Sequence, residues 1–289
     1  MRDRQEQQGG DQAANLQAGR DIVVHQGLSA TDLAAITDTF RANLAEMRGV
    51  AKEVFAERAE HLLNQVLERL ANENPESVRH AADPDFQLAL IDAATAHGRT
   101  GDPDLEQLLV NILVDRVAQP SRSLAHIILG EALTVAPKLT PAHIDALTVS
   151  WFMRNLQFQC AEPGEVAAVF AVHALPFLTD WPISASAYQH LQYLGCGQVS
   201  PLQADFDPLM PHKFPALFAR HGEAQVATAL QEIHLALQAT GNEQLQRFAD
   251  SWNNSDSKSF IPTALGIVIA HANHRRKTGQ QLDLSIWVH

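Results

Sequence analysis

The sequence has few cysteines and no long apolar run, and these two shortages exclude several classes of protein. Its two cysteines, Cys160 and Cys196, cannot build a disulfide framework or a four-thiolate metal site, and so small a number suits a reducing cytosol. No stretch reaches the roughly 18 apolar residues that a membrane span requires. The polar start, residues 1–5, lacks the apolar core of a signal peptide. Together these features predict a cytoplasmic protein.

Basic residues are also scarce, and this argues against negatively charged partners. Lys and Arg number 21 against 33 Asp and Glu, which gives a formal net charge of −12. A net acidic chain without a long basic run is poorly suited to wrap nucleic acid or to coat an anionic membrane. Residues 155–212 contain no Lys or Arg at all. Such a segment is either deeply buried or part of an interface, and we favour burial.

Several enzyme motifs are missing as well. The sequence has no G-x-x-x-x-G-K-[ST] phosphate loop, no G-x-G-x-x-G after a predicted strand and no G-x-S-x-G turn. It also lacks the regular alternation of strands and helices that builds a parallel sheet. These absences argue against P-loop nucleotide hydrolases, Rossmann-type dinucleotide enzymes and α/β-hydrolases.

The overall composition is that of a globular protein, but the N-terminal residues differ from the rest of the sequence. Apolar residues make up 46% of the 289 residues, which is ample for one large domain or two small ones. Residues 1–28 are expected to be a flexible leader that ends in a short strand. The first part of this leader is too polar to bury a core, whereas Ile22, Val23 and Val24 form a β-branched run between glycines. A single strand needs a partner from elsewhere in the chain or from another subunit.

The strongest periodic pattern covers residues 29–72 and predicts one long amphipathic helix. Its apolar positions recur at steps of three and four, beginning with Leu33, Ile36, Phe40, Leu44, Met47 and Val54. A helix of about 40 residues is about 60 Å long, so part of its stripe needs a cover outside its own domain, such as a second subunit. The alternative is that Gly49 divides the segment into two ordinary helices.

Residues 83–279 predict a body of shorter helices with clear start and stop signals. Asp83-Pro84, Asp102-Pro103 and Thr140-Pro141 each place a capping side chain before a proline, and Gly279 is suited to end the last helix. Residues 282–288 then alternate apolar and polar, which predicts a C-terminal strand. The predicted fold class is mainly α: a multi-helix body with one long N-terminal helix and a small β element from the N- and C-terminal strands.

Several segments of this chain resemble one uncharacterised bacterial family with an all-helical body. They include a Gly- and Asp-containing leader with the run Gln17-Ala18-Gly19-Arg20-Asp21-Ile22, followed by residues 113–116, 136–140, 145–147, 270–273, 277–279 and 284–287. The resemblance would cover nearly the whole chain. It implies no reaction and no catalytic residue, and related leaders occur on proteins linked to bacterial conflict and phage defence.

The fourteen histidines require metal and acid–base roles to be considered. His271 and His274 lie three apart on the last predicted helix and therefore share a face. Zinc ligands on helices are more often four apart with a carboxylate nearby, and no Asp or Glu lies between Asp256 and Asp283. A metal site here is the less favoured interpretation, and a polar helix end is the more favoured one.

Other candidate residues also have ordinary structural explanations. Arg275, Arg276 and Lys277 form the one basic cluster, but it is short for a nucleic-acid patch and suits the negative end of a helix dipole. His143 is expected to cap a helix or to form a surface pair in its first turn. His173 and His190 are expected to be buried and hydrogen-bonded. Cys196, between two glycines, is expected on a turn where a thiol could be exposed, without a catalytic role.

The function predicted from the sequence is therefore non-catalytic. We expect a cytoplasmic bacterial protein that self-assembles and binds a protein partner, in a defence or stress setting, without a cofactor. The residues expected in the assembly interface are Ile22, Val23, Val24, Leu33, Phe40, Leu44, Met47 and Val54. The alternative is a metal-dependent hydrolase or nuclease centred on His271 and His274. A third possibility is binding of nucleic acid through Arg275, Arg276 and Lys277.

Overall fold

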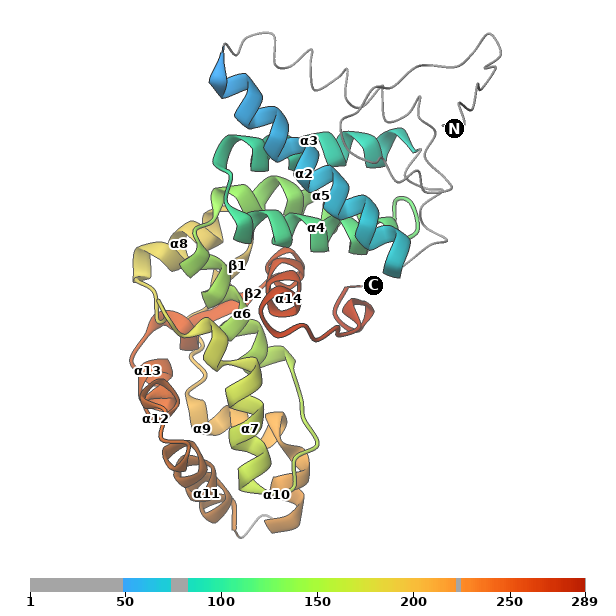
Figure 1. Cartoon of the computed structure of the whole chain (residues 1–289). Coiled ribbons are helices and arrows are strands. Elements are labelled where there is room, and N and C mark those ends of the chain that lie inside the picture. The colour runs from blue at the N-terminus through green and yellow to red at the C-terminus, as the bar shows by residue number, and fades with distance from the viewer. Residues whose placement is uncertain (1–48, 74–82, 222–224, 289) are drawn as a thin grey trace, which may run out of the picture.

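The computed structural model describes residues 49–73, 83–221 and 225–288, and in this part the fold is mainly α with one small two-stranded antiparallel sheet (Figure 1). The helices are α2 (Val50–Glu73), α3 (Pro84–Thr100), α4 (Pro103–Val117), α5 (Leu124–Val135), α6 (Pro141–Asn155), α7 (Pro163–His173), α8 (Ala185–Tyr193), α9 (Phe206–Lys213), α10 (Pro215–His221), α11 (Val226–Ala239), α12 (Glu243–Gln246), α13 (Phe248–Asn253) and α14 (Ala264–Thr278). The predicted fold class is confirmed at this level.

The predicted capping signals define the helix ends. The Asp83 and Asp102 side chains accept hydrogen bonds from main-chain N–H groups in the first turns of α3 and α4, each of which begins with a proline. Thr140 and His143 form a reciprocal capping box at the start of α6. Gly279 ends α14 with a φ of 70°, a left-handed conformation that glycine adopts without steric cost.

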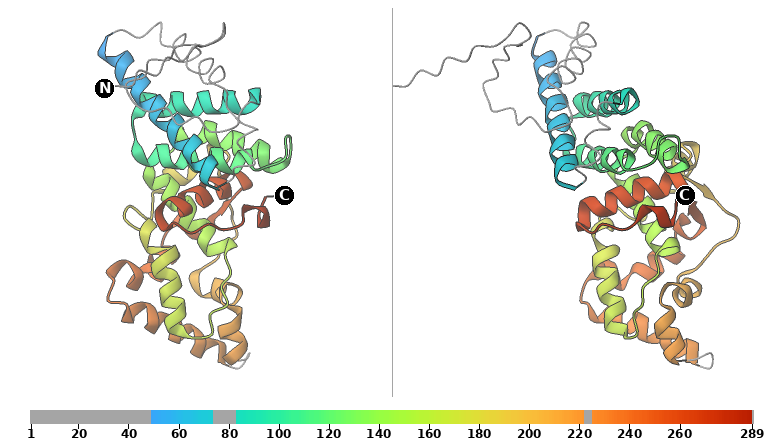
Figure 2. Two further views of the ribbon diagram at one scale, coloured as in Figure 1. Left: turned by 45° about the vertical axis from the view of Figure 1, so that its right-hand side comes forward. Right: turned by 90° about the vertical axis from the view of Figure 1, so that its right-hand side faces the viewer.

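The helices form two groups with α14 and α6 between them. Helices α2 to α5 lie together at one end of the molecule, and α7 and α9 to α13 lie at the other end (Figures 1 and 2). α14 packs against α4, α5 and α6, and its residues from Gly266 to Arg275 are buried. The helix near the C-terminal end of the described chain therefore occupies the centre of the fold.

The prediction of one continuous helix over residues 29–72 is wrong at Gly49. This residue has a φ of 63°, which a right-handed helix cannot contain, and α2 begins directly after it. The apolar stripe of α2 from Phe55 to Leu70 packs against α3 and α4 of the same chain, so this part needs no cover from a second subunit. Val54 is half-buried, and the other seven predicted assembly residues, Ile22 to Met47, lie outside the described residues.

The predicted C-terminal strand is also wrong. Residues Leu284–Ile286 form a 3-10 turn, which the Asp283 side chain caps by accepting a hydrogen bond from the Ser285 N–H. Leu284 and Val288 are buried while Ile286 is 63% exposed, so the burial repeats every four residues and not every two. The predicted N-terminal strand lies outside the described part of the chain.

The small sheet comes instead from two segments inside the helical body. β1 (Gly197–Val199) pairs with β2 (Phe260–Pro262) in antiparallel register, with Val199 opposite Phe260. β2 is largely buried, whereas Gln198 and Val199 of β1 are exposed. The exposed side of this sheet is therefore β1, which follows α8 through a short turn (Figure 1).

No helix in residues 49–73, 83–221 and 225–288 is long and apolar enough to cross a membrane.

Candidate functional site

The basic cluster that the sequence singled out is paired with carboxylates. Arg275, Arg276 and Lys277 lie in the last turn of α14, and each contacts acidic side chains on neighbouring helices. The pairs are Arg275 with Glu73 and Asp115, Arg276 with Asp104, and Lys277 with Asp145 at 2.7 Å. These pairs join α14 to α2, α4 and α6. Their charges stabilise the centre of the fold and are largely compensated.

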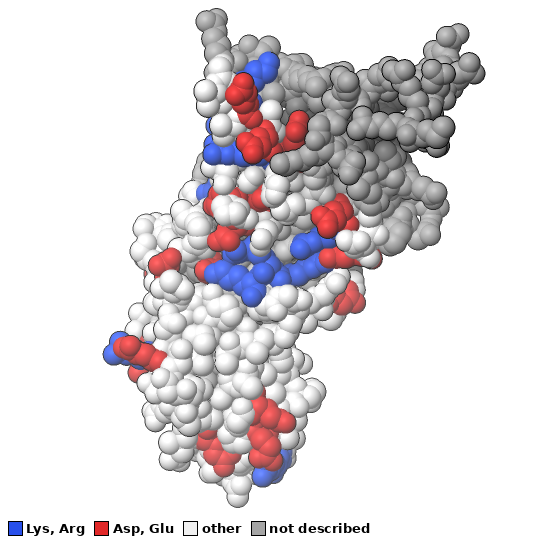
Figure 3. All heavy atoms as spheres, in the orientation of Figure 1, with Lys and Arg blue, Asp and Glu red and all other residues white. Residues whose placement is uncertain are grey.

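The surface view agrees with this placement. Figure 3 shows Lys and Arg gathered in a band across the middle of one face, at the height of α14, with Asp and Glu along its borders. The Arg276 side chain, paired with Asp104, is only 9% exposed. A nucleic acid would have to compete with carboxylates already in contact with the cations.

His274 forms a buried pair with His173 of α7. The Nδ1 atom of His173 lies 2.8 Å from the Nε2 atom of His274, and the two rings are nearly parallel. Burial and, to a smaller extent, the nearby Lys213 lower the pKa of His173 to about 4. Burial, together with His173 and His271, lowers the pKa of His274 to about 3. Both rings are therefore neutral near pH 7, and one donates its proton to the other.

His271 is engaged elsewhere although it shares the face of α14 with His274. Its Nε2 atom donates to the carbonyl oxygen of Leu282 at 2.8 Å, and its Nδ1 atom lies 3.5 Å from a carboxylate oxygen of Asp115. Within the described ranges, no three His, Cys, Asp or Glu side chains are grouped as a metal site requires. The geometry brings the two histidines near Trp151 but gives them separate partners.

Cys196 differs from its expected environment. It lies on the turn before β1, as predicted, but it is fully buried, so the expectation of an exposed thiol is wrong. Burial raises the pKa of the Cys196 thiol to about 12. A thiol with so high a pKa carries almost no thiolate near pH 7 and is a poor nucleophile.

Lys213 is a buried charged residue that sequence reasoning missed. Its Nζ atom donates to the carbonyl oxygens of Phe152 and Leu156 and lies 3.6 Å from the centroid of the Phe152 ring. It thus caps the C-terminal end of α6, where helix carbonyls lack intrahelical partners. Burial lowers its pKa well below the usual range. The one available signal was its position directly after the window without Lys or Arg.

A concave surface lies between α8 and β1. It is a groove of about 520 Å³, here called the α8–β1 groove. Its lining residues come mainly from α8 and are Ala185, Tyr188, Gln189, Gln192, Tyr193, Val199 and Asp256. A second hollow of about 560 Å³ shares Ala185 and Asp256 with the groove and continues it past Asn253, Asn254 and Lys258.

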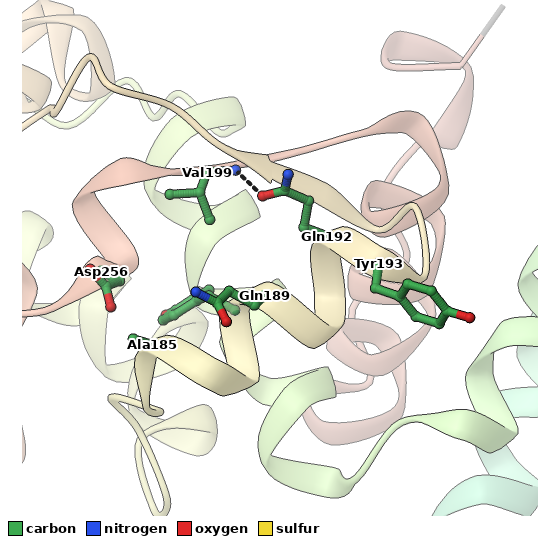
Figure 4. A pocket seen from close by; sticks show the side chains of 7 residues that line it. Ala185, Gln189, Gln192, Tyr193, Val199 and Asp256 are labelled. Carbon is green, nitrogen blue, oxygen red and sulfur yellow. Dashed lines mark hydrogen bonds between the residues drawn. The ribbon is translucent and has the colours of Figure 1, made fainter.

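The walls of the groove combine fixed and exposed groups (Figure 4). The Tyr188 hydroxyl is held by the Ser257 hydroxyl at 2.6 Å, so this ring forms a rigid floor. The Oε1 atom of Gln192 accepts a hydrogen bond from the Val199 N–H at 3.1 Å. Tyr193 at the end of α8 is 85% exposed, and its ring points away from Gln189 and Ala185 (Figure 4). The sequence gave no motif for this groove beyond its place in the window 155–212.

The comparisons with known proteins identify a family and no chemistry. The chain belongs to an uncharacterised family, whose model matches residues 27–241 and 225–288, most of the sequence. No curated protein and no solved structure matches it. Membership in this family therefore assigns no activity to any of these residues.

Proposed function

We propose that this protein is a non-catalytic assembly protein that self-associates and recognises a protein partner through the α8–β1 groove. The observation that carries this proposal is an exposed aromatic residue, Tyr193, beside a groove lined by both apolar and amide side chains. The resemblance of the leader to those of bacterial conflict proteins supports a bacterial, cytoplasmic and defence-related setting as part of the same proposal.

The chemistry of the groove suits a polypeptide. Tyrosine supplies a large, rigid contact area with little loss of side-chain entropy, and exposed tyrosines are common at the centres of interfaces. Gln189 and Gln192 present amide groups that can bond to a peptide backbone. The apolar contribution comes from Ala185 and Val199, and Val199 is 40% exposed.

The reactive side chains of the molecule support a non-catalytic role because they are engaged inside it. The cations of α14 are paired with acids, His173 and His274 bond to each other, and Cys196 is buried. Of the described features, none favours the alternative of a hydrolase or nuclease at His271 and His274. That alternative remains a prediction from the sequence.

The test is the molar mass of the full chain, measured by light scattering behind a sizing column over a range of concentrations. The wild type is expected to be oligomeric, and Tyr193→Asp is expected to weaken self-association by at least about tenfold. Because Tyr193 is exposed, this variant should keep the circular dichroism spectrum of the wild type.

A matched control is Leu88→Asp on α3, a helix that contributes no residue to the groove lining, since Leu88 is also exposed, at 63%. This variant should associate like the wild type. A wild type that is monomeric at every concentration, or equal weakening by both substitutions, would refute assembly through the groove.

A further inference from the structure

We infer that the α8–β1 groove binds the segment Arg20–His25 of a second copy of this chain in an extended conformation. This inference rests on the proposed function and names the polypeptide that the groove recognises. Four observations support it: an edge of β1 where a side chain holds the N–H group, a matching pattern of side chains, a carboxylate without a nearby cation, and the absence, among the described residues, of the strand partner that the sequence predicted.

The first observation is that, at the free edge of β1, a side chain fills the hydrogen-bonding position that a neighbouring strand would occupy. Ser200 N–H bonds to the carbonyl oxygen of Ser259, so the ladder to β2 uses the residue after Val199. In an antiparallel ladder the adjacent residue directs its N–H to the opposite edge. There the Val199 N–H is taken by the side-chain oxygen of Gln192 and not by a strand carbonyl (Figure 4). The Gln192 side chain thus accepts the hydrogen bond of Val199, and the carbonyl group of an added strand could replace it.

The second observation is the pattern of the segment Arg20-Asp21-Ile22-Val23-Val24-His25. In an extended chain Arg20, Ile22 and Val24 project to one face, because side chains alternate. These three positions span about 13 Å at 3.3 Å per residue. The groove wall along α8, from Ala185 to Gln192, is about 11 Å long at 1.5 Å per residue. The segment and the groove therefore have similar lengths.

The third observation is the charge at one end of the groove. Among the described residues, no cation lies within ion-pair distance of the Asp256 carboxylate, and Lys258, its near neighbour in sequence, is paired with Asp205 at 3.3 Å. With Arg20 beside Asp256, Ile22 and Val24 would lie over the apolar part of the groove at Ala185 and Val199. The segment thus complements both the charge and the apolar surface.

The fourth observation is that the strand predicted to pair with residues 22–25 does not form, and that the segment is joined to the body by enough residues to reach a second molecule. Residues 282–288, the predicted partner, form a 3-10 turn, and the described chain contains no third strand. The 23 residues between His25 and Gly49 can span up to about 80 Å. The N-terminal end of α2, drawn in blue, lies at one end of the molecule in each view (Figures 1 and 2). An arm of this length can extend beyond its own body to a neighbouring molecule.

The test is chemical cross-linking between two full-length proteins with one added cysteine each. Val23→Cys protein is mixed with Gln189→Cys protein and treated with a short bismaleimide; the native Cys160 and Cys196 are buried. A covalent dimer can join positions 23 and 189 only between copies. We expect this dimer at several times the yield of a control mixture in which Leu235→Cys, an exposed position on α11, replaces Gln189→Cys. Equal yields in the two mixtures would overturn the inference.

A charge exchange provides a second readout. Arg20→Glu should weaken self-association about two- to fivefold, as expected for an exposed ion pair, and Asp256→Arg in the same chain should restore it. Failure of the restoration would count against the Arg20–Asp256 contact. If Tyr193→Asp dissociates the oligomer but the cross-link is absent, the groove mediates assembly with another segment. If neither effect occurs, the proposed function fails as well.

Discussion

The buried pair of His173 and His274 predicts a specific loss of stability in mild acid. Both pKa values are lowered in the folded protein, to about 4 and about 3, from 6.5 in the unfolded chain. The unfolded state therefore binds more protons below pH 6.5, and folding stability falls as the pH decreases from there towards the folded-state pKa values. Above pH 6.5 this contribution to stability is fully present.

The magnitude follows from the protonation of the unfolded chain. At pH 5.5 an unfolded histidine is about ten parts protonated to one part neutral, while the folded histidines remain neutral. This difference destabilises the fold by about 1.4 kcal/mol for each histidine, or about 2.8 kcal/mol for the pair. The value requires only that both folded-state pKa values lie below about 5. The groups that face the pair, Lys213 and His271, also oppose its protonation.

The assay is urea unfolding at pH 7.5 and pH 5.5 for the wild type and for His173→Gln. Glutamine can still bond to His274 but does not titrate, so the loss of stability between the two pH values should be about 1.4 kcal/mol smaller in the variant. His221, whose pKa is raised by its bond to the Leu217 carbonyl, acts in the opposite direction in both proteins. Identical pH dependence in the two proteins would refute the assignment of a neutral buried pair.

Two further substitutions test the packing and charge pairs of the centre. Gly266→Ala should destabilise the fold by at least about 2 kcal/mol, because a Cβ atom at this position would overlap the main chain of the turn before β1. The control is Gly164→Ala in α7, where a Cβ atom meets open space, and this variant should be neutral or stabilising by about 0.5 kcal/mol. Thermal unfolding of the two variants and the wild type measures the difference. Lys277→Met should lower the free energy of unfolding in urea by about 2 kcal/mol, because it leaves the buried Asp145 carboxylate without its cation. Arg220→Met breaks an exposed ion pair with Glu162 and should lower the free energy of unfolding by less than about 1 kcal/mol. Equal losses within either comparison would contradict the corresponding reasoning.

Local signals in the sequence predicted the helical body well. The Asp-Pro and Thr-Pro starts and Gly279 act through hydrogen bonds within a few residues, so they are readable without knowledge of the fold. The small sheet could not be read this way. Its strands have three residues each, and they are joined across more than 60 positions of sequence. Such pairing depends on where the surrounding helices place the two segments.

The candidate site was predicted less well than the fold. The sequence identified His271, His274 and the basic cluster, but only the structure shows that their partners come from α2, α4, α6 and α7. The alternation in residues 282–288 was misleading because a turn that buries every fourth residue gives the same apolar pattern as a strand over so short a length. The groove has no motif, since its shape arises from the packing of α8 beside β1.

The central position of α14 also has a consequence for synthesis on the ribosome. α4 and α6 are complete once residue 155 has been made, but the helix that covers them and neutralises Asp104, Asp115 and Asp145 ends at residue 278. The intervening 123 residues take roughly 6–25 s to synthesise at about 5–20 residues per second. During this interval the apolar faces of the early helices lack their final cover. The nascent chain is then a natural client for chaperones until its last helix emerges.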